Sequence, residues 1–410
     1  MRKKEKFDFQ AIIVGAGPAG SSCASFLGKG GIKTLLLDKA FFPRDKSCGD
    51  GISGKSIKLL KELGLQEKIE SALHEKIFGV IFSSPNGELL EVQIPKNQEI
   101  MKYGYDARRE VFDDVIFQNA KRFAKTIEGF EVKDLLKQNG KVIGVVGKNS
   151  KGKEESFTAP IVVGADSANS VVARKAGLWS IHPKHHIVAL RAYYSGIIGM
   201  KNMIELHFLQ GILPGYFWIF PLENGLANVG IGMTLEKRNQ KKINLEEAMF
   251  NAIEKEPLFK DRFREAKRVS EVKAWNLPLA TAKKAIVGEG VILIGDAASL
   301  IDPFTGEGIG NALLSGKIAA ETIEQALEKK DFSKEFLQEY EKALWQNIGK
   351  EIKNSSYLQK LSNYPWLFNM IVSKANRNKK IANFIAESLV NQEARRKMEN
   401  PLFFIKALFA

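Results

Sequence analysis

A short apolar run, a glycine-rich turn and a helical stretch follow one another near the start of the chain, and this order constrains the fold. Residues 9–14, "FQAIIV", are apolar and β-branched, as is typical of a buried strand. They lead into Gly15, Gly17 and Gly20, spaced Gly-x-Gly-x-x-Gly, with Ala19 inside the turn. Glycines permit a tight turn, and the helix behind them offers bare N–H groups to a pyrophosphate. We expect these four residues to contact a bound dinucleotide.

The second strand of this unit is predicted at residues 32–37, after the glycines of residues 28–31 break the helix. It ends at Asp38, whose carboxylate can accept hydrogen bonds from ribose hydroxyls. Strand, turn, helix, strand and acid together form the βαβ context that a lone glycine motif lacks. The sequence therefore predicts an α/β fold with a Rossmann-type domain.

Two further apolar strands end in a glycine and a carboxylate. Residues 161–174, "IVVGADSANSVVAR", carry Asp166, and residues 291–310, "VILIGDAASLIDPFTGEGIG", carry Gly295 and Asp296 before a glycine-bounded loop. A carboxylate at a strand end, beside main-chain N–H groups, suits a polyol chain and a ring edge. Both are features of a flavin, so these segments predict a flavin nucleotide site.

The three strand ends, in this order, resemble the flavoprotein superfamily typified by p-hydroxybenzoate hydroxylase. Members usually carry Asp-Gly in the middle motif, where this chain has Asp166 followed by Ser167. Three more segments resemble the geranylgeranyl reductase family: "FPRDKSCGDGIS" at residues 42–53, "REVFD" at 109–113 and "YFWIFP" at 216–221. The combined resemblance spans residues 9 to about 320.

The resemblance implies FAD as the cofactor and assigns roles by position. Asp38 would bind the adenosine ribose, the Val132 backbone would lie near the adenine, and Asp296 would hold the ribityl–pyrophosphate region. Cys48, Gly49 and Gly51 would line the flavin and substrate site. The remaining expected cofactor contacts are Arg44, Arg109, Asp166, Gly295, Gly308 and Ile309.

The resemblance also implies a domain plan. The FAD-binding domain would be discontinuous, with residues 1–75, 105–180 and 285–325. A substrate-binding sheet would use residues 76–104 and 181–284, where alternating apolar runs indicate strands. Residues 326–410 would form a C-terminal helical region.

The reaction implied by the resemblance is saturation of carbon–carbon double bonds in a polyprenyl chain, on a lipid, a diphosphate, a chlorophyll precursor or a quinone. An isolated alkene becomes reducible when a proton reaches it as a hydride arrives. We expect Cys48 to position the alkene and relay the proton, and Asp50 to keep the thiol protonated. If residues 216–220 form a strand, Tyr216, Trp218 and Phe220 share one face that could hold the chain. A turn-filling cysteine and an aromatic core strand are the structural alternatives.

Composition limits the partners. The chain has 61 basic and 47 acidic residues, a net charge of +14. This charge suits an acidic lipid surface or a phosphorylated substrate, and no recognised nucleic-acid-binding module accompanies it. Two cysteines indicate a reducing, cytoplasmic setting, and no metal site is expected. The C-terminal segments "YPWLFNMIVSKANRNKK" and "PLFFIKALFA" mix apolar groups with cations, so they suit either core packing or the inner membrane surface.

Two questions stay open at this level. The electron donor could be NADPH, NADH or a transient ferredoxin-type protein, because no second Gly-x-Gly-x-x-Gly lies in a βαβ setting. The alternative activity is an FAD-dependent monooxygenase or halogenase acting on an aromatic or apolar substrate. Flavin halogenases resemble this architecture but carry Trp-x-Trp-x-Ile-Pro, so "YFWIFP" favours the reductase.

Overall fold

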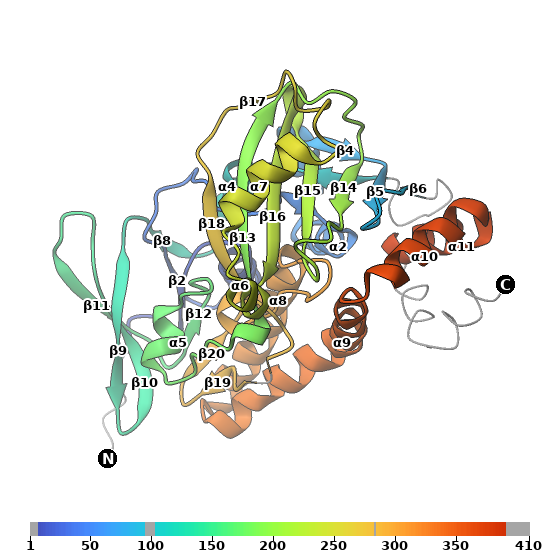
Figure 1. Cartoon of the computed structure of the whole chain (residues 1–410). Helices are drawn as coiled ribbons and strands as arrows, with labels where there is room; N and C mark the ends of the chain where they lie inside the picture. Colours follow the sequence, from blue (N-terminus) through green and yellow to red (C-terminus); the bar gives the residue numbers. More distant parts are fainter. Residues whose placement is uncertain (1–6, 95–102, 283, 391–410) are drawn as a thin grey trace, which may run out of the picture.

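The computed structural model describes residues 7–94, 103–282 and 284–390. It confirms the α/β fold, with a Rossmann-type sheet, a larger sheet beside it and a helical C-terminal part (Figure 1). The predicted tail segment at residues 401–410 lies outside the described residues.

The first sheet has six strands in the order β19-β20-β12-β1-β2-β8, and all neighbours are parallel except the β19–β20 pair. The central strands β1 and β2 are almost entirely apolar and fully buried, because both faces of this sheet are covered. The strands are β1 (Ala11–Val14), β2 (Thr34–Leu37), β8 (Lys125–Ile127), β12 (Val162–Gly164), β19 (Val287–Gly288) and β20 (Val291–Leu293).

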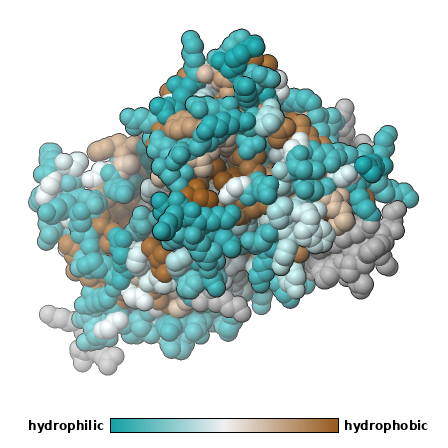
Figure 2. Space-filling view, viewed as in Figure 1, coloured by the Kyte–Doolittle hydropathy of each residue, from teal (hydrophilic) through white to brown (hydrophobic). Residues whose placement is uncertain are grey.

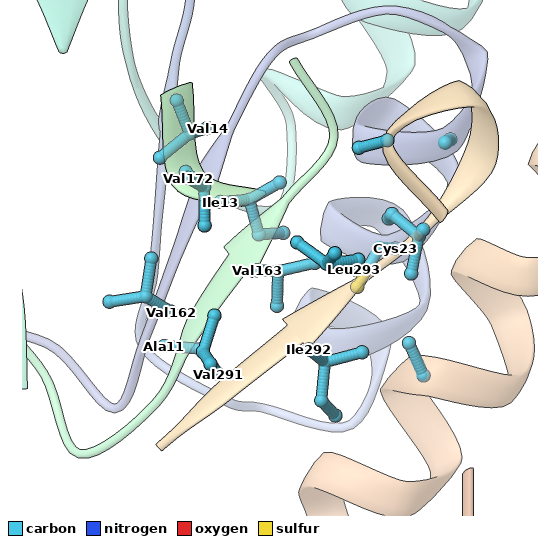
Figure 3. Packing of buried hydrophobic residues seen from close by; sticks show 14 of the residues in the cluster. Ala11, Ile13, Val14, Cys23, Val162, Val163, Val172, Val291, Ile292 and Leu293 are labelled. Carbon is cyan, nitrogen blue, oxygen red and sulfur yellow. The ribbon is translucent and has the colours of Figure 1, made fainter. Parts of the chain in front are cut away.

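Helices and a small sheet complete this domain. Helix α1 packs against α4 and α8, and the antiparallel sheet β11-β10-β9 contributes to the same core. Figure 3 shows strand side chains packed near Cys23 of α1, which is fully buried and belongs to this core. The elements are α1 (Pro18–Lys29), α4 (Arg109–Ala120), α5 (Val171–Lys175), α8 (Ile309–Lys329), β9 (Glu131–Gln138), β10 (Lys141–Lys148) and β11 (Glu154–Thr158).

The second large sheet has eight strands, β17-β13-β16-β15-β14-β5-β6 with β18 paired to β13. Strands from both segments predicted for the substrate domain join it. Its outer face forms a separate core with α7, while its inner face turns toward the first domain. The elements are β5 (Gly79–Ser83), β6 (Leu89–Gln93), β13 (His186–Ser195), β14 (Ile204–His207), β15 (Tyr216–Pro221), β16 (Leu226–Thr234), β17 (Lys267–Arg268), β18 (Lys273–Pro278), α6 (Leu235–Lys241) and α7 (Leu245–Lys255). The strands expected from the apolar runs of residues 181–284 are present as β13, β14, β15 and β16, whereas the two helices were not expected.

A three-stranded sheet, β3-β7-β4, carries the end of the cysteine segment. Strand β3 begins three residues after Cys48, so the cysteine segment leads into an ordered element. The elements are β3 (Gly51–Ile52), β4 (Glu75–Ile77), β7 (Gly104–Asp106), α2 (Gly54–Leu63) and α3 (Gln66–Ser71).

The C-terminal part is helical, as predicted. Helix α9 (Lys334–Leu361) packs along α8, and α10 (Pro365–Arg377) with α11 (Lys379–Val390) packs against β6. Figure 1 shows these helices in orange and red, reaching from the first domain to the edge of the larger sheet. Among the described residues no helix is long and apolar enough to cross a bilayer.

Candidate active site

The glycine-rich turn between β1 and α1 forms a cradle in which Gly15 and Gly20 leave no space for a side chain. Gly15 has a φ of +103°, and a Cβ added there would lie 2.4 Å from the Ala165 carbonyl oxygen. A Cβ at Gly20 would lie 1.8 Å from the Gly15 carbonyl oxygen. The N-cap of α1 is Gly17, with no side chain bonded to the first N–H groups. The turn therefore fits a pyrophosphate, as the sequence predicts.

Asp38 is fixed at the end of β2, next to this cradle. Its carboxylate accepts hydrogen bonds from the Ala16 amide at 2.7 Å and the Ala40 amide at 2.8 Å. Each oxygen keeps a further lone pair for a ribose hydroxyl. The Phe130 amide donates to the Asp38 carbonyl at 2.8 Å, which brings the start of β9, with Val132, beside the same strand end.

Two arginines share one buried carboxylate beneath the cradle. Arg109 binds Asp113 through two hydrogen bonds of 2.7 Å, and Arg44 binds it at 2.6 Å. Arg44 also reaches the turn, since a Cβ at Gly17 would lie 3.6 Å from its Nη2. Burial disfavours the charge of Asp113, but Arg109 and Arg44 hold its pKa below the ordinary value. The pair therefore places positive charge where a pyrophosphate would bind.

The second predicted flavin segment meets the first at this edge. Asp296 follows β20 in a short 3₁₀ turn (Gly295–Ala298), and Lys46 binds its carboxylate at 3.0 Å. A Cβ at Gly295 would lie 2.9 Å from the Ala19 side chain. Gly308 is the N-cap of α8, whose first residue is Ile309. The residues expected to bind FAD near Asp296 thus lie beside the cradle.

The middle motif, which contains Asp166, stabilises the start of helix α5. The Asp166 carboxylate accepts bonds from the Ser170 hydroxyl at 2.5 Å and the Val171 amide at 2.6 Å, so it caps α5. Ser167 has a φ of +69°, a backbone conformation that favours glycine. Serine at this position is therefore strained, which agrees with the Asp-Gly sequence usual in the flavoprotein superfamily that the chain resembles.

The cysteine segment is tied to the inner face of the larger sheet by Asn228 of β16. The Asn228 amide donates to the Cys48 carbonyl oxygen at 2.6 Å and to the Asp50 carboxylate at 2.8 Å, and accepts from Trp218 Nε1 at 2.9 Å. Tyr193 of β13 donates to the same Asp50 oxygen at 3.0 Å. One buried amide therefore joins the thiol segment, the carboxylate and the aromatic strand.

Aromatic side chains of β15 alternate as expected. Tyr216, Trp218 and Phe220 form a continuous row with centroid spacings of 6.0 and 6.4 Å, while Phe217 lies in the core on the opposite face. A Cβ added at Gly49 would lie 3.1 Å from the Phe220 ring. The cysteine segment therefore contacts the aromatic row at Gly49, where a larger side chain would crowd the Phe220 ring.

The groups around the thiol differ in part from the expectation. Asp50 has a φ of +69° and directs its carboxylate to Tyr193 and Asn228, whereas Arg109 lies beside the Cys48 side chain. Burial opposes the charge of Arg109, but Asp113 and Cys48 hold its pKa well above the ordinary value. Asp50 is therefore not the only charged residue near Cys48, because Arg109 contacts the Cys48 side chain.

A family profile described as an FAD binding domain matches residues 8–342. Digeranylgeranylglycerophospholipid reductase 2 of Methanopyrus kandleri is 30% identical over 353 residues, covering 84% of each chain. Menaquinone reductase of Mycobacterium tuberculosis is 32% identical over 327 residues, covering 76% of each. The chain belongs to the geranylgeranyl reductase family of FAD-dependent oxidoreductases.

Solved structures agree with this family. A geranylgeranyl bacteriochlorophyll reductase-like protein of Thermoplasma acidophilum superimposes with a TM-score of 0.83 at 25% identity, over 95% of this chain and 98% of that one. A flavin-dependent brominase gives a TM-score of 0.77 at 22% identity, over 97% and 99% of the chains, and so shares the fold. In this geranylgeranyl reductase family member, the glycine cradle and its cations fit FAD.

Four residues of the site in this family member were not predicted from the sequence: Asp106, Arg191, Tyr193 and Asn228. Asn228 carried one weak signal, a polar residue inside the apolar strand "LANVGIGM". Arg191 is 1% exposed, binds Asp45 at 2.6 Å and stacks over the Tyr193 ring at 4.2 Å. The Arg191–Asp45 pair joins residues 146 positions apart, so no local sequence pattern could predict it.

Proposed function

We propose that this protein saturates double bonds in the polyprenyl chain of a membrane lipid, with FAD as its redox cofactor. The observation that carries the proposal is the contact between the Tyr216–Trp218–Phe220 row and the segment containing Cys48. An aromatic surface suits an isoprenoid chain, and a ring face stabilises positive charge by about 1–2 kcal/mol when water is excluded. The names of the similar reductases support a prenyl-bearing substrate.

Different residues of the chain have different roles in the proposed alkene reduction. Reduced FAD, when bound, supplies a hydride. Cys48 donates a proton to the alkene carbon that does not receive the hydride, and the aromatic row holds the chain while cationic character develops. Asn228 bonds both the Cys48 carbonyl oxygen and Trp218, so it holds the proton donor close to the aromatic row.

The substrate class can be tested directly. The purified protein, reduced anaerobically with dithionite, is mixed with vesicles that contain either a digeranylgeranylglycerol phospholipid or a menaquinone. Mass spectrometry should show products heavier by two hydrogens or a multiple of two, and the more reactive vesicle names the class. No mass shift with either lipid would contradict the proposal. Oxygen uptake coupled to a hydroxylated or halogenated product would instead support the monooxygenase alternative.

The electron donor is proposed to be NADPH, NADH or a ferredoxin-type protein. The net charge of +14 suits any of these anionic donors. Stopped-flow reduction of the bound flavin by each donor separates them, since the true donor bleaches the flavin absorbance fastest.

We also propose that the corner between α9 and α10 contacts the membrane surface. Tyr357, Tyr364 and Trp366 are 59%, 54% and 63% exposed, and lysines and an arginine flank them on the same helices. Amphipathic aromatic rings and cations favour the lipid headgroup region. Phe368 of α10 packs at a tilt against Phe208, with ring centroids 4.5 Å apart, and Phe208 contacts Tyr216, so this corner connects to the aromatic row.

Replacing both Tyr364 and Trp366 with alanine should weaken binding to vesicles of acidic phospholipid at least several-fold in a sedimentation assay. The matched control is Val269→Ala, which removes an equally exposed apolar side chain (53%) on the distant sheet domain. Equal binding of the double variant and the wild type would exclude this surface. Binding that the control also loses would indicate a nonspecific effect and would count against it as well.

A further inference from the structure

Three carboxyl side chains lie in a row on the β3-β7-β4 sheet, beside the cysteine segment. Asp106 of β7 is paired with Glu75 of β4 on one side and with Gly51 of β3 on the other. Residues directly opposite on antiparallel strands share a face, with Cβ atoms about 4.5–5.5 Å apart. Asp50 immediately precedes Gly51, and its carbonyl oxygen accepts a hydrogen bond from the Ala107 amide at 3.0 Å. The row therefore runs from Glu75 through Asp106 to Asp50.

The row leads from partly exposed to fully buried positions. Glu75 is half-buried, whereas Asp106 and Asp50 are 1% and 0% exposed. Within the described part of the chain, Asp106 Oδ2 and Asp50 Oδ1 are buried without a hydrogen-bond partner. Buried carboxyl oxygens are rarely left unpaired, because the lost hydration is costly. Like charges this close are also unfavourable, so the row is stable only when it holds protons.

The groups facing each carboxyl differ. Asp106 faces Asp50 and Glu75, so burial first and then the Asp50 charge raise its pKa well above the ordinary value. Asp50 faces Asn228, Arg191, Tyr193 and Arg109. Burial raises the pKa of Asp50 to about 6, although these four partners favour its charged form. Asp106, which holds its proton more tightly than an ordinary aspartate, therefore stands next to Asp50, whose partners favour the charged form that can receive that proton.

A separate observation points to the inner end of the row. Arg191 is fully buried, and its Nε and Nη1 have no partner among the described residues. Its guanidinium stacks on Tyr193, which donates to Asp50. Asn228 bonds both the Asp50 carboxylate and the Cys48 carbonyl oxygen. It therefore links Asp50, at the inner end of the row, to the segment that carries Cys48.

We propose that Glu75, Asp106 and Asp50 form a proton relay that returns a proton from solvent to Cys48 after each reduction. The inference rests on the proposed function. When the thiol gives its proton to one alkene carbon and a hydride from reduced FAD reaches the other, Cys48 is left as a thiolate. Asp50 takes a proton from Asp106 and passes it to that sulfur, directly or through one water. Glu75 and solvent restore Asp106, so each turnover consumes one hydride and one solvent proton.

The first test needs no substrate and no cofactor. Infrared spectra of the apoprotein at pH 7 should contain a protonated-carboxyl band that Asp106→Asn diminishes by the intensity of one group. Glu70→Gln is the matched control, because Glu70 accepts from Tyr105 on the neighbouring position of β7 but lies outside the row. An unchanged band in the Asp106 variant would show that Asp106 is ionised and would overturn the relay.

The stability of Asp106→Asn has a pH signature. In the unfolded chain this carboxyl ionises near a pKa of about 4, whereas the folded protein keeps it protonated to higher pH. Wild-type stability from this group is therefore full below pH 4 and falls as the pH rises. Relative to the wild type, the melting temperature of the variant should rise steadily from pH 4 to pH 8. A constant difference would contradict the assignment.

The second test uses the loaded enzyme and the lipid vesicles described above. Asp106→Asn should lower alkene reduction at least tenfold while FAD affinity and flavin reduction by dithionite stay at wild-type values. Glu75→Gln, at the solvent end, should lower it less, and Glu70→Gln should leave it unchanged. Wild-type turnover in both relay variants would overturn the relay. A wild-type protein that reduces no polyprenyl lipid would instead contradict the proposed function.

Discussion

Replacing Cys48 with alanine is expected to lower alkene reduction at least 100-fold while FAD stays bound. The thiol is the proton donor in the proposed reaction, and general acids contribute about 10²–10⁴-fold. Arg109, Tyr216 and the Cys48 backbone contacts place this side chain where the glycine cradle, the Asp296 turn and the aromatic row converge. The measurement is single-turnover oxidation of the reduced flavin by the lipid substrate.

The chain supplies its own control for this substitution. Cys23 is the other cysteine, and it is fully buried in the packing of α1 against the central strands. Burial raises the pKa of its thiol, so it should not react. Cys23→Ala should keep wild-type turnover, and a thiol reagent should label one group in the folded protein and two after unfolding. Full turnover by Cys48→Ala would remove the cysteine from the mechanism.

Replacing Asp113 with alanine is expected to destabilise the protein by about 3–5 kcal/mol, the usual cost of leaving a buried cation unpaired. Asp113 is fully buried and binds both Arg109 and Arg44. Its loss would leave the Arg109 guanidinium, 4% exposed, without its bidentate partner and would release Arg44 from beneath the cradle. Urea unfolding of the apoprotein measures the change, and FAD titration should show weaker binding.

The effect of Asp113 depends on pH in a defined direction. The folded-state pKa of Asp113 is lowered, so its stabilisation is full above the unfolded pKa of about 4 and is lost as the pH falls through the folded value. The deficit of Asp113→Ala should therefore shrink below pH 4. Asp114→Ala is the control, because the adjacent carboxylate bonds only the exposed Gln118 in the described structure. A deficit equal to that of Asp114→Ala would refute the buried-pair account.

Much of the fold followed from local sequence patterns. The first βαβ unit is present, with β1 and β2 each starting two residues after the expected position, and the apolar strands before Asp166 and Asp296 are β12 and β20. These predictions succeeded because strand and helix periodicity, glycine turns and strand-end carboxylates are properties of neighbouring residues. The helices α6 and α7 were missed because the region was interpreted as strands throughout.

The site divides in the same way. The glycine cradle, Asp38, Asp296 and the shared face of the aromatic strand could be predicted, since each depends on a motif or on period-two alternation. The polar and charged groups around Cys48 could not be predicted from the sequence. Arg109, Asn228 and Tyr193 come from elements separated from Cys48 by between 61 and 180 positions, and only chain packing brings them together.

The sequence by itself determined that this chain builds a flavin-binding βαβ unit, because the positive φ at Gly15 and the close contact at Gly20 are demands of the local backbone. It also determined that three aromatic rings share one face of a strand. Only the tertiary structure decided what those rings face and which charges surround the thiol. Burial and cross-strand pairing set those charges, and both exist only once distant segments have packed.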